Sequence, residues 1–134
     1  MGSRKQAGVL EADPLFEETL ELIEELRRRE AGWNGYHVAA PNPAAITAAK
    51  RWAQALYSEV VRRERPWIQP HVSSDEEGNI SFEWWCKPRK LTVYVMPGNT
   101  EAIKVWGLDI NTEMEETPAG TTEQRVALWR WLRG

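Results

Sequence analysis

The residues best suited to acid–base, nucleophilic or metal chemistry are few in this chain and lie far apart. The two histidines, His37 and His71, have no second ligand at a spacing typical of a metal site. His71 and the acidic turn at residues 75–77 could together bind a cation, although acidic turns are also common as ordinary solvated loops. We therefore predict no metal site and no cofactor.

The remaining candidates for chemistry are a cysteine and two carboxylates. Cys86, the single cysteine, excludes an internal disulfide and a cysteine zinc site, and its predicted position on a strand beside Trp84 favours a buried thiol over a nucleophile. Glu83 and Asp109 have no evident partner for paired-carboxylate chemistry, and no nucleophile elbow, phosphate loop or dinucleotide fingerprint occurs. We expect a protein that is not an enzyme, although a site assembled from distant residues would leave no such pattern.

Three helices are predicted to frame these residues. Asp13 and Asn42 each precede a proline, which is the signature of a capped helix start. Apolar residues then recur with a period near 3.6. Gly32 is expected to end the first helix, and Thr121 or Thr122 to cap the last. The expected helices begin at residues 14, 43 and about 122 and end before 32, near 63 and at 133.

Beyond Pro66 the hydrophobic pattern changes to a period of two, which predicts strands joined by short turns. The expected strands cover residues 67–73, 80–86, 91–96 and 102–108, with a weaker fifth over 110–115. Pro70 makes the first an edge or bulged strand. The predicted class is α+β: two N-terminal helices, a four- to five-stranded antiparallel meander sheet and one C-terminal helix, with helices on one face. Residues 1–12 are expected to form a flexible arm and 13–134 a single domain.

A meander of this order brings basic residues from distant parts of the chain to one end of the sheet. Alternate turns lie at opposite ends, so the start of the first strand and the turn between the second and third share an end. The charges could be solvated turn residues, or they could form a contact surface, since Arg and Trp dominate binding hot spots. On the second interpretation the partner-binding residues are Arg62, Arg63, Arg65, Trp67, Trp85, Lys87, Arg89 and Lys90.

Eight tryptophans are many for a chain of 134 residues. Trp84 and Trp85 are neighbours on a predicted strand, so their side chains point to opposite faces of the sheet. If helices cover one face only, one of these two rings is exposed or covered by a partner; otherwise the last helix packs over it. Tyr94 and Trp106 could share the face of Trp85 and extend it into an aromatic row.

The whole-chain composition narrows the class of protein. A net charge of −3 argues against a dedicated nucleic-acid binder, which is usually strongly basic. The apolar runs are too short for a membrane span, and the N-terminus lacks the pattern of a signal peptide. We therefore expect a cytoplasmic protein that does not associate with membranes.

Two motifs carry a resemblance. The loop Gly32-Trp33-Asn34-Gly35-Tyr36 is followed by Pro70-x-Val72 and by the strand Gly78-Asn79-Ile80-Ser81-Phe82-Glu83-Trp84. Over residues 32–106 this pattern resembles a group of small bacterial and phage proteins that typically read W-D-G-Y-G-A and D-G-x-I-x-L-E-W, from which Asn34 and His37 depart. The resemblance implies a bacterial or phage origin. It also implies a structural role for Trp33 and Tyr36, packed against the sheet with Glu83 nearby.

These observations favour a non-enzymatic protein-binding module whose partner is a larger protein or complex. A phage-encoded inhibitor or regulator of a host machine, such as RNA polymerase or a defence complex, fits the size and the lack of chemistry. One alternative is an antitoxin or immunity-type protein, whose acidic residues would face a basic toxin. A nucleic-acid-binding domain using the basic end of the sheet is a further alternative, and an unrecognised enzyme is the last.

Overall fold

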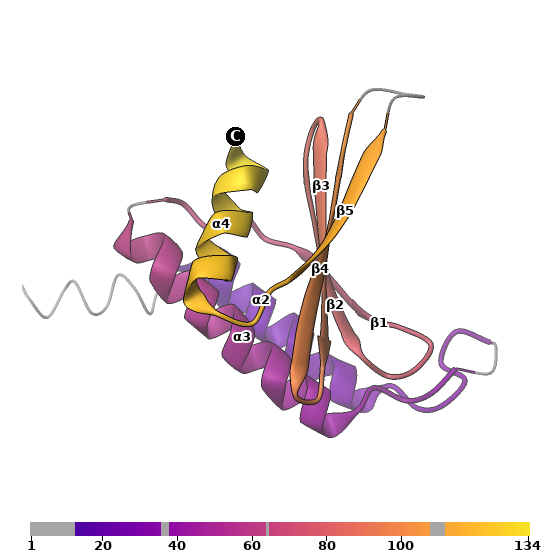
Figure 1. Ribbon diagram of the computed structural model, residues 1–134. Helices are drawn as coiled ribbons and strands as arrows, with labels where there is room; N and C mark the ends of the chain where they lie inside the picture. Colours follow the sequence, from indigo (N-terminus) through magenta and orange to yellow (C-terminus); the bar gives the residue numbers. More distant parts are fainter. Residues whose placement is uncertain (1–12, 36–37, 64, 108–111) are drawn as a thin grey trace, which may run out of the picture.

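The computed structural model describes residues 13–35, 38–63, 65–107 and 112–134, which form three α-helices and one antiparallel sheet (Figure 1). The helices are α2 (Pro14–Glu25), α3 (Pro43–Arg62) and α4 (Thr122–Arg133), with a 3-10 turn, η1 (Leu26–Arg28), after α2. The strands are β1 (His71–Ser74), β2 (Ile80–Cys86), β3 (Arg89–Met96), β4 (Asn99–Trp106) and β5 (Glu113–Pro118). They pair in chain order, so the predicted α+β class with an antiparallel sheet is confirmed. The predicted arm, residues 1–12, lies outside the described residues.

The helices begin where their capping residues predict. The side chains of Asp13 and Asn42 each accept two backbone N–H groups from the first turn that follows. Thr121 and Gln124 form a reciprocal capping box at the start of α4. The first helix ends earlier than its Gly32 stop signal indicates, because the chain tightens into η1 after Glu25. No described helix is long and apolar enough to cross a membrane.

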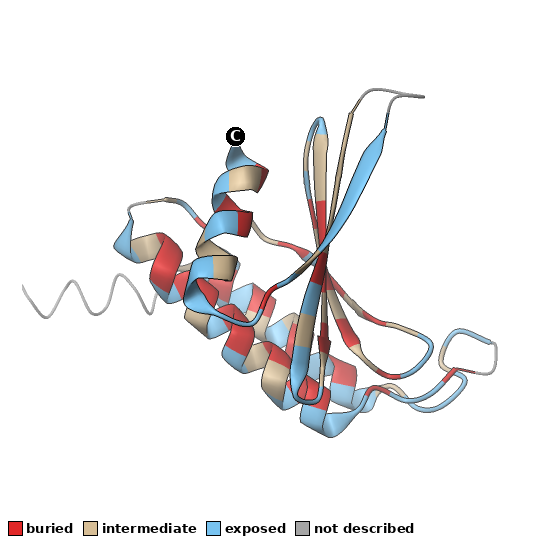
Figure 2. Ribbon diagram, in the orientation of Figure 1, coloured by how far each residue is buried: buried red, intermediate tan, exposed pale blue. Residues whose placement is uncertain are grey.

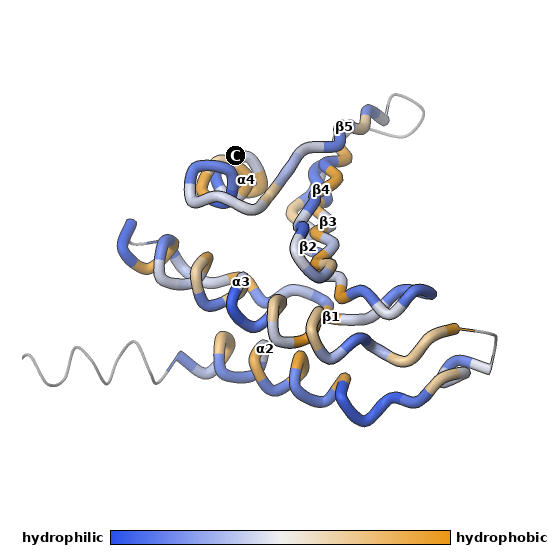
Figure 3. The backbone as a smooth tube through the Cα atoms, turned by 60° about the horizontal axis from the view of Figure 1, so that its bottom comes forward, coloured by the Kyte–Doolittle hydropathy of each residue, from blue (hydrophilic) through white to orange (hydrophobic). Residues whose placement is uncertain are grey.

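All three α-helices lie on one side of the sheet (Figures 1 and 3). Alternation along β2 follows from this arrangement: Ile80, Phe82 and Trp84 are buried against the helices, whereas Trp85 faces the other way and is exposed. Buried residues accordingly lie along the helices and the middle of the sheet in Figure 2. The described helices therefore all cover one face of the sheet, and none of them covers the other.

Several strand bounds differ from those predicted. β1 starts at His71 rather than residue 67, because Pro70 cannot donate to a strand ladder. The turn between β2 and β3 is only two residues long, so Cys86 pairs with Arg89 and β3 starts earlier than expected. β4 likewise begins at Asn99, directly after a short turn. β5 spans residues 113–118 instead of 110–115 and forms one edge of the sheet, opposite β1.

Aromatic rings fill the space between the helices and the sheet. Trp67, in the segment before β1, stacks on Trp129 of α4 with ring centroids 5.4 Å apart and an interplanar angle of 12°. Trp84 of β2 meets both of these rings edge-on, at 6.2 and 5.8 Å. Aromatic pairs in such geometries contribute about 0.5–1.5 kcal/mol each beyond the area they bury. This cluster fixes α4 against the sheet.

Buried indoles also need acceptors for their N–H groups. Trp67 donates to the hydroxyl of Thr19 at 3.1 Å, and Trp84 donates to the carbonyl of Ile68 at 2.7 Å. The N–H of Trp129 is buried and has no acceptor among the described residues. That unsatisfied donor is unusual in a well-packed interior.

One bidentate ion pair joins α3 to α4. Two nitrogens of the Arg125 guanidinium donate to the two carboxylate oxygens of Glu59, at 3.0 and 2.9 Å. Only 12% of the Arg125 side chain and 9% of the Glu59 side chain are exposed. Both charges are therefore largely removed from water and depend on each other for compensation.

The turn between β1 and β2 packs against the segment that leads into α3. The carbonyl of Gly78 accepts the N–H of Asn42 at 2.8 Å, and the N–H of Ala39 donates to Glu76 at 2.9 Å. Gly78 has a φ of +88°, and a Cβ atom placed there would lie 2.5 Å from the carbonyl oxygen of Ala40. Glycine is required at this position for both its backbone conformation and its lack of a side chain.

This requirement predicts unequal effects of two alanine substitutions. Gly78→Ala should lower the free energy of unfolding by about 3 kcal/mol, since left-handed strain adds to a backbone clash. Gly98→Ala is the matched control, because Gly98 also has a positive φ (+79°) but nothing within 4 Å of its Cβ direction. It should cost only about 1 kcal/mol. Urea unfolding measures both, and equal losses would contradict the clash.

The Glu59–Arg125 pair predicts a non-additive series. Glu59→Met alone or Arg125→Met alone should each cost about 3 kcal/mol, because each leaves one buried charge without its partner. The double substitution should cost less than either single one, since no unpaired charge remains. Denaturant unfolding of the four proteins completes the cycle, and additive losses would show that the two charges do not compensate each other.

Candidate functional site

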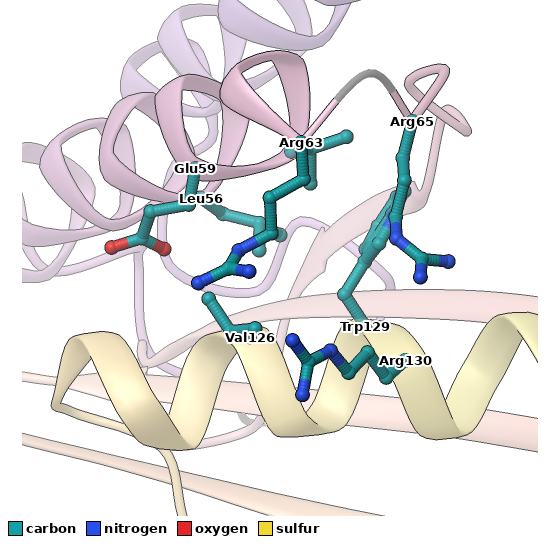
Figure 4. A pocket seen from close by; sticks show the side chains of 8 residues that line it. Leu56, Glu59, Arg63, Arg65, Val126, Trp129 and Arg130 are labelled. Carbon is teal, nitrogen blue, oxygen red and sulfur yellow. The ribbon is translucent and has the colours of Figure 1, made fainter.

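Five of the six basic residues expected to converge lie in two groups on either side of α4. Arg63 and Arg65 line a pocket between the end of α3 and α4 (Figure 4). Lys87, Arg89 and Lys90 line a second pocket at the end of the β2–β3 hairpin. α4 lies between them (Figure 1): its Trp129 and Arg130 line the first pocket, and its Trp131 ring lies beside Arg89 of the hairpin. The two groups therefore line separate pockets rather than one, and their expected role in binding a partner stays a prediction.

Three of the expected partner-binding residues face other surroundings. Trp67 is only 4% exposed and stacks on Trp129 in the core, so its expected place at the surface is wrong. Arg89 lies on the helix side of the sheet, with its guanidinium 5.6 Å from the ring centroid of Trp131. Arg62 lies at neither group and lines a separate hollow on α3.

The uncovered face of the sheet carries a row of three apolar side chains and one lysine. Trp85 is paired in register with Lys90, Lys90 with Val105, and Val105 with Met114, so the four side chains lie side by side across four strands. Trp85 is 60% exposed and Met114 65% exposed, whereas Trp84 on the opposite face is 1% exposed. The expectation that the two neighbouring tryptophans face opposite ways is confirmed. We call Trp85, Lys90, Val105 and Met114 the open-face row.

The expected aromatic row is only partly present. Tyr94 shares the open face, being an even number of residues from Lys90 along β3. Trp106 does not, because it pairs with Arg89 and therefore faces the helices. Its ring meets that of Trp131 edge-on at 5.8 Å. The strand register, rather than the aromatic composition, decides which rings reach the surface.

Polar contacts hold Trp85 in place. The ammonium of Lys90 lies 4.8 Å from the Trp85 ring centroid and 3.1 Å from the Glu83 carboxylate. Trp85 in turn donates its indole N–H to Glu83 at 3.2 Å. Burial tends to raise the pKa of Glu83, but the hydrogen bonds from Lys90 and Trp85, with the charges of Lys90 and His71, outweigh it and hold that pKa below its usual value. The exposed ring is thus fixed by a network on its own face.

The loop before α3 has a different attachment from the one expected. Glu83 is engaged by Lys90 and Trp85 rather than by the Trp33 loop. The Trp33 ring instead receives the guanidinium of Arg29 at 4.0 Å, and Arg29 donates to the hydroxyl of Ser74 in β1 at 3.1 Å. Tyr36 and His37 lie outside the described residues.

Groups suited to catalysis remain scattered. The described ranges contain no group of three or more His, Cys, Asp or Glu side chains that could hold a metal ion. Cys86 is half-buried, although a buried thiol was expected. Asp109 lies outside the described residues, so its expected lack of a carboxylate partner stays a prediction.

Sequence reasoning missed three surface residues of interest. Val105 could have been found from the alternation of β4, had its start at Asn99 been known. Met114 gives no such signal, because its face depends on the register of β5 against β4. Arg130 lies on α4 and joins Arg63 and Arg65 only through the packing of two helices distant in sequence.

The Glu83 network predicts a pH dependence of stability. Because the pKa of Glu83 is lower in the folded protein than its ordinary value of 4.5, its contribution is present above pH 4.5 and is lost as the pH falls through the folded pKa. Glu83→Gln should therefore show a shallower loss of stability between about pH 5 and pH 3. Lys90→Met, which removes the main donor, should behave similarly. Denaturation at a series of pH values tests this, and slopes equal to the wild type would exclude the network.

Comparisons with known proteins do not assign a function to these surfaces. No model of a known protein family, no curated protein and no solved structure matches this chain. The resemblance carried by the Trp33 loop and the β2 motif stays a prediction. The function must therefore be inferred from the surfaces themselves.

Proposed function

We propose that this protein is a non-enzymatic protein-binding module and that its contact surface is the uncovered face of the sheet. The observation that carries the proposal is the open-face row, in which Trp85 and Met114 are 60% and 65% exposed. No described helix or strand packs over this row (Figure 3). Exposed apolar groups in a contiguous row are typical of surfaces that bind another protein.

The row has the energetic properties of a binding hot spot. Tryptophan is among the residues that most often dominate protein interfaces, and a buried aromatic side chain removes about 150–250 Å² from water. Trp85 is already held by Glu83 and Lys90, so little side-chain freedom is lost on binding. A partner that covers Trp85 and Met114 therefore gains apolar burial at a small ordering cost.

The surrounding charges indicate the chemistry of the partner. Glu101 and Glu116 are exposed on the same face and make no ion pair with any described residue. Glu83 is already compensated by Lys90. The complementary surface is therefore apolar at its centre, with Lys or Arg toward β4 and β5. An acidic rim disfavours nucleic acid on this face, since phosphates would be repelled.

Two kinds of partner fit this surface. A regulator or inhibitor of a larger machine would place the open face on that machine. An antitoxin or immunity-type protein would place it on a basic toxin. The specific observation in favour of this second form is that the exposed carboxylates of Glu101 and Glu116 form no ion pair with a described residue.

The proposal predicts that single substitutions on the open face abolish binding without unfolding the protein. Tagged protein captures a stoichiometric partner from nuclease-treated lysate of the source organism, and Trp85→Ala and Met114→Ala each weaken this capture about tenfold or more. Leu15→Ala is the matched control, because Leu15 is also an exposed large apolar residue (44%) but lies on α2. It should capture the same partner at the wild-type level.

Thermal unfolding accompanies the capture experiment. Met114→Ala and Leu15→Ala should stay within about 0.5 kcal/mol of the wild type in stability, as is usual for surface positions. Trp85→Ala also loses the contacts with Glu83 and Lys90 and should cost about 1–2 kcal/mol while staying folded. Undiminished capture by Trp85→Ala and Met114→Ala would overturn the assignment of the surface. Retention of nucleic acid alone in an untreated lysate would overturn the protein-binding proposal itself.

A further inference from the structure

β5 forms an edge of the sheet, and no described helix or strand lies beyond it (Figures 1 and 3). Its residues are exposed, apart from the half-buried Thr117. The opposite edge, β1, is only four residues long. There Arg29 donates to the hydroxyls of Ser73 and Ser74, at 3.4 and 3.1 Å. β5 is therefore the longer and more accessible of the two edges.

The register identifies the backbone groups of β5 that point away from the sheet. The N–H of Ala119 donates to the carbonyl of Thr100 at 3.0 Å. In an antiparallel pair of strands, hydrogen-bonded and non-hydrogen-bonded residue pairs alternate. The unbroken register between β4 and β5 therefore turns the backbone groups of the odd-numbered residues of β5 toward β4, and those of Met114 and Glu116 outward. Pro118 has no N–H, so the edge that can pair ends there.

The side chains of β5 give this edge a chemical pattern. Met114 and Glu116 lie on the open face, whereas Glu113 and Glu115 lie on the helix side. Glu115 forms an ion pair with Lys104 at 2.8 Å. Glu113 and Glu116 are exposed and form no ion pair with a described residue. A strand added to this edge would therefore meet one such carboxylate on each side of the sheet and one exposed apolar side chain.

We propose that β5 binds an extended, basic peptide segment, which adds to the sheet as a sixth strand. The proposal rests on the protein-binding function proposed above, and the segment is the part of the partner that meets β5. In strand addition, backbone hydrogen bonds supply affinity and side chains set specificity. Antiparallel pairing is the more stable form. Read from its N-terminus, the segment carries Lys or Arg opposite Glu116, an apolar residue opposite Met114 and Lys or Arg opposite Glu113.

The added strand would also continue the open-face row. Met114 is the last member of that row and is 65% exposed. An apolar side chain opposite it, about 5 Å away across the strands, would cover part of this exposed surface. The outward backbone groups, the charge of the two glutamates and the neighbouring apolar side chain therefore all indicate the same kind of occupant.

The test uses a synthetic peptide with blocked ends, Thr-Lys-Thr-Val-Lys-Thr, and nuclear magnetic resonance of the isotope-labelled protein at low salt. The peptide should slow hydrogen exchange of the Met114 and Glu116 amides about tenfold, because their N–H groups become paired. N-methylation of the valine and of the first lysine, whose N–H groups would face β5, should weaken binding about tenfold. N-methylation of the threonine between them is the matched control, because its N–H points away from β5, and binding should be unchanged.

Protein variants separate this edge from the open face. Glu113→Lys should weaken both peptide binding and partner capture about fivefold, because a repulsive charge replaces an attractive one. The side chain of Glu113 lies on the helix side, so this effect does not pass through the open face. Glu18→Lys, an exposed position on α2, is the matched control with the same change of charge and should leave both unchanged. Trp85→Ala should keep peptide binding, since β2 lies three strands from β5.

The outcomes distinguish this proposal from the function on which it rests. Equal binding of the two N-methylated peptides, or no protection of the Met114 and Glu116 amides at about 1 mM peptide, would overturn strand addition. Capture that is lost in Trp85→Ala but kept in Glu113→Lys would overturn the role of β5 and leave the open face as the contact surface. Protection that rises with protein concentration in the absence of peptide would replace the peptide with a second copy of the chain.

Discussion

The stacking of Trp67 on Trp129 is the contact on which the arrangement of the molecule depends. Trp67 also meets Phe16 of α2 edge-on at 5.2 Å and Tyr57 of α3 at 5.8 Å, so one ring touches all three helices. Trp84 of β2 closes the cluster from the sheet side. Because α4 is held here, it fills the helix side of the sheet, separates the basic residues and leaves the far face uncovered. The open face of the sheet and the pocket between α3 and α4 both result from this position of α4.

Much of the fold could be predicted because its signals are local. The helix starts rest on Asp13, Asn42 and Thr121, each of which acts within one turn of its own position. The opposite exposure of Trp84 and Trp85 rests on the alternation of a single strand. The faces of Trp106 and Met114 could not be predicted in this way, since they depend on turn lengths and on register between strands. The grouping of Arg63, Arg65 and Arg130 around one pocket was harder still to predict, because it depends on how α3 and α4 pack against each other.

The open face of the sheet and the pocket between α3 and α4 carry charges of opposite sign. The open face combines the exposed side chains of Trp85 and Met114 with exposed carboxylates on β4 and β5, whereas Arg63, Arg65 and Arg130 line the pocket between α3 and α4. The small net charge of the whole chain conceals this separation.

The edge strand β5 also bears on self-association. A sheet edge exposes backbone donors and acceptors that can template a strand from another molecule, which is a common route to aggregation. In β5, Glu113, Glu115 and Glu116 are exposed, and among the described residues only Glu115 has an ion-pair partner, Lys104 at 2.8 Å. Two copies meeting edge to edge through β5 would bring these carboxylates together and repel each other. Glu116, which also favours a basic partner on the open face, is therefore one of the residues that help to keep the chain from polymerising with itself.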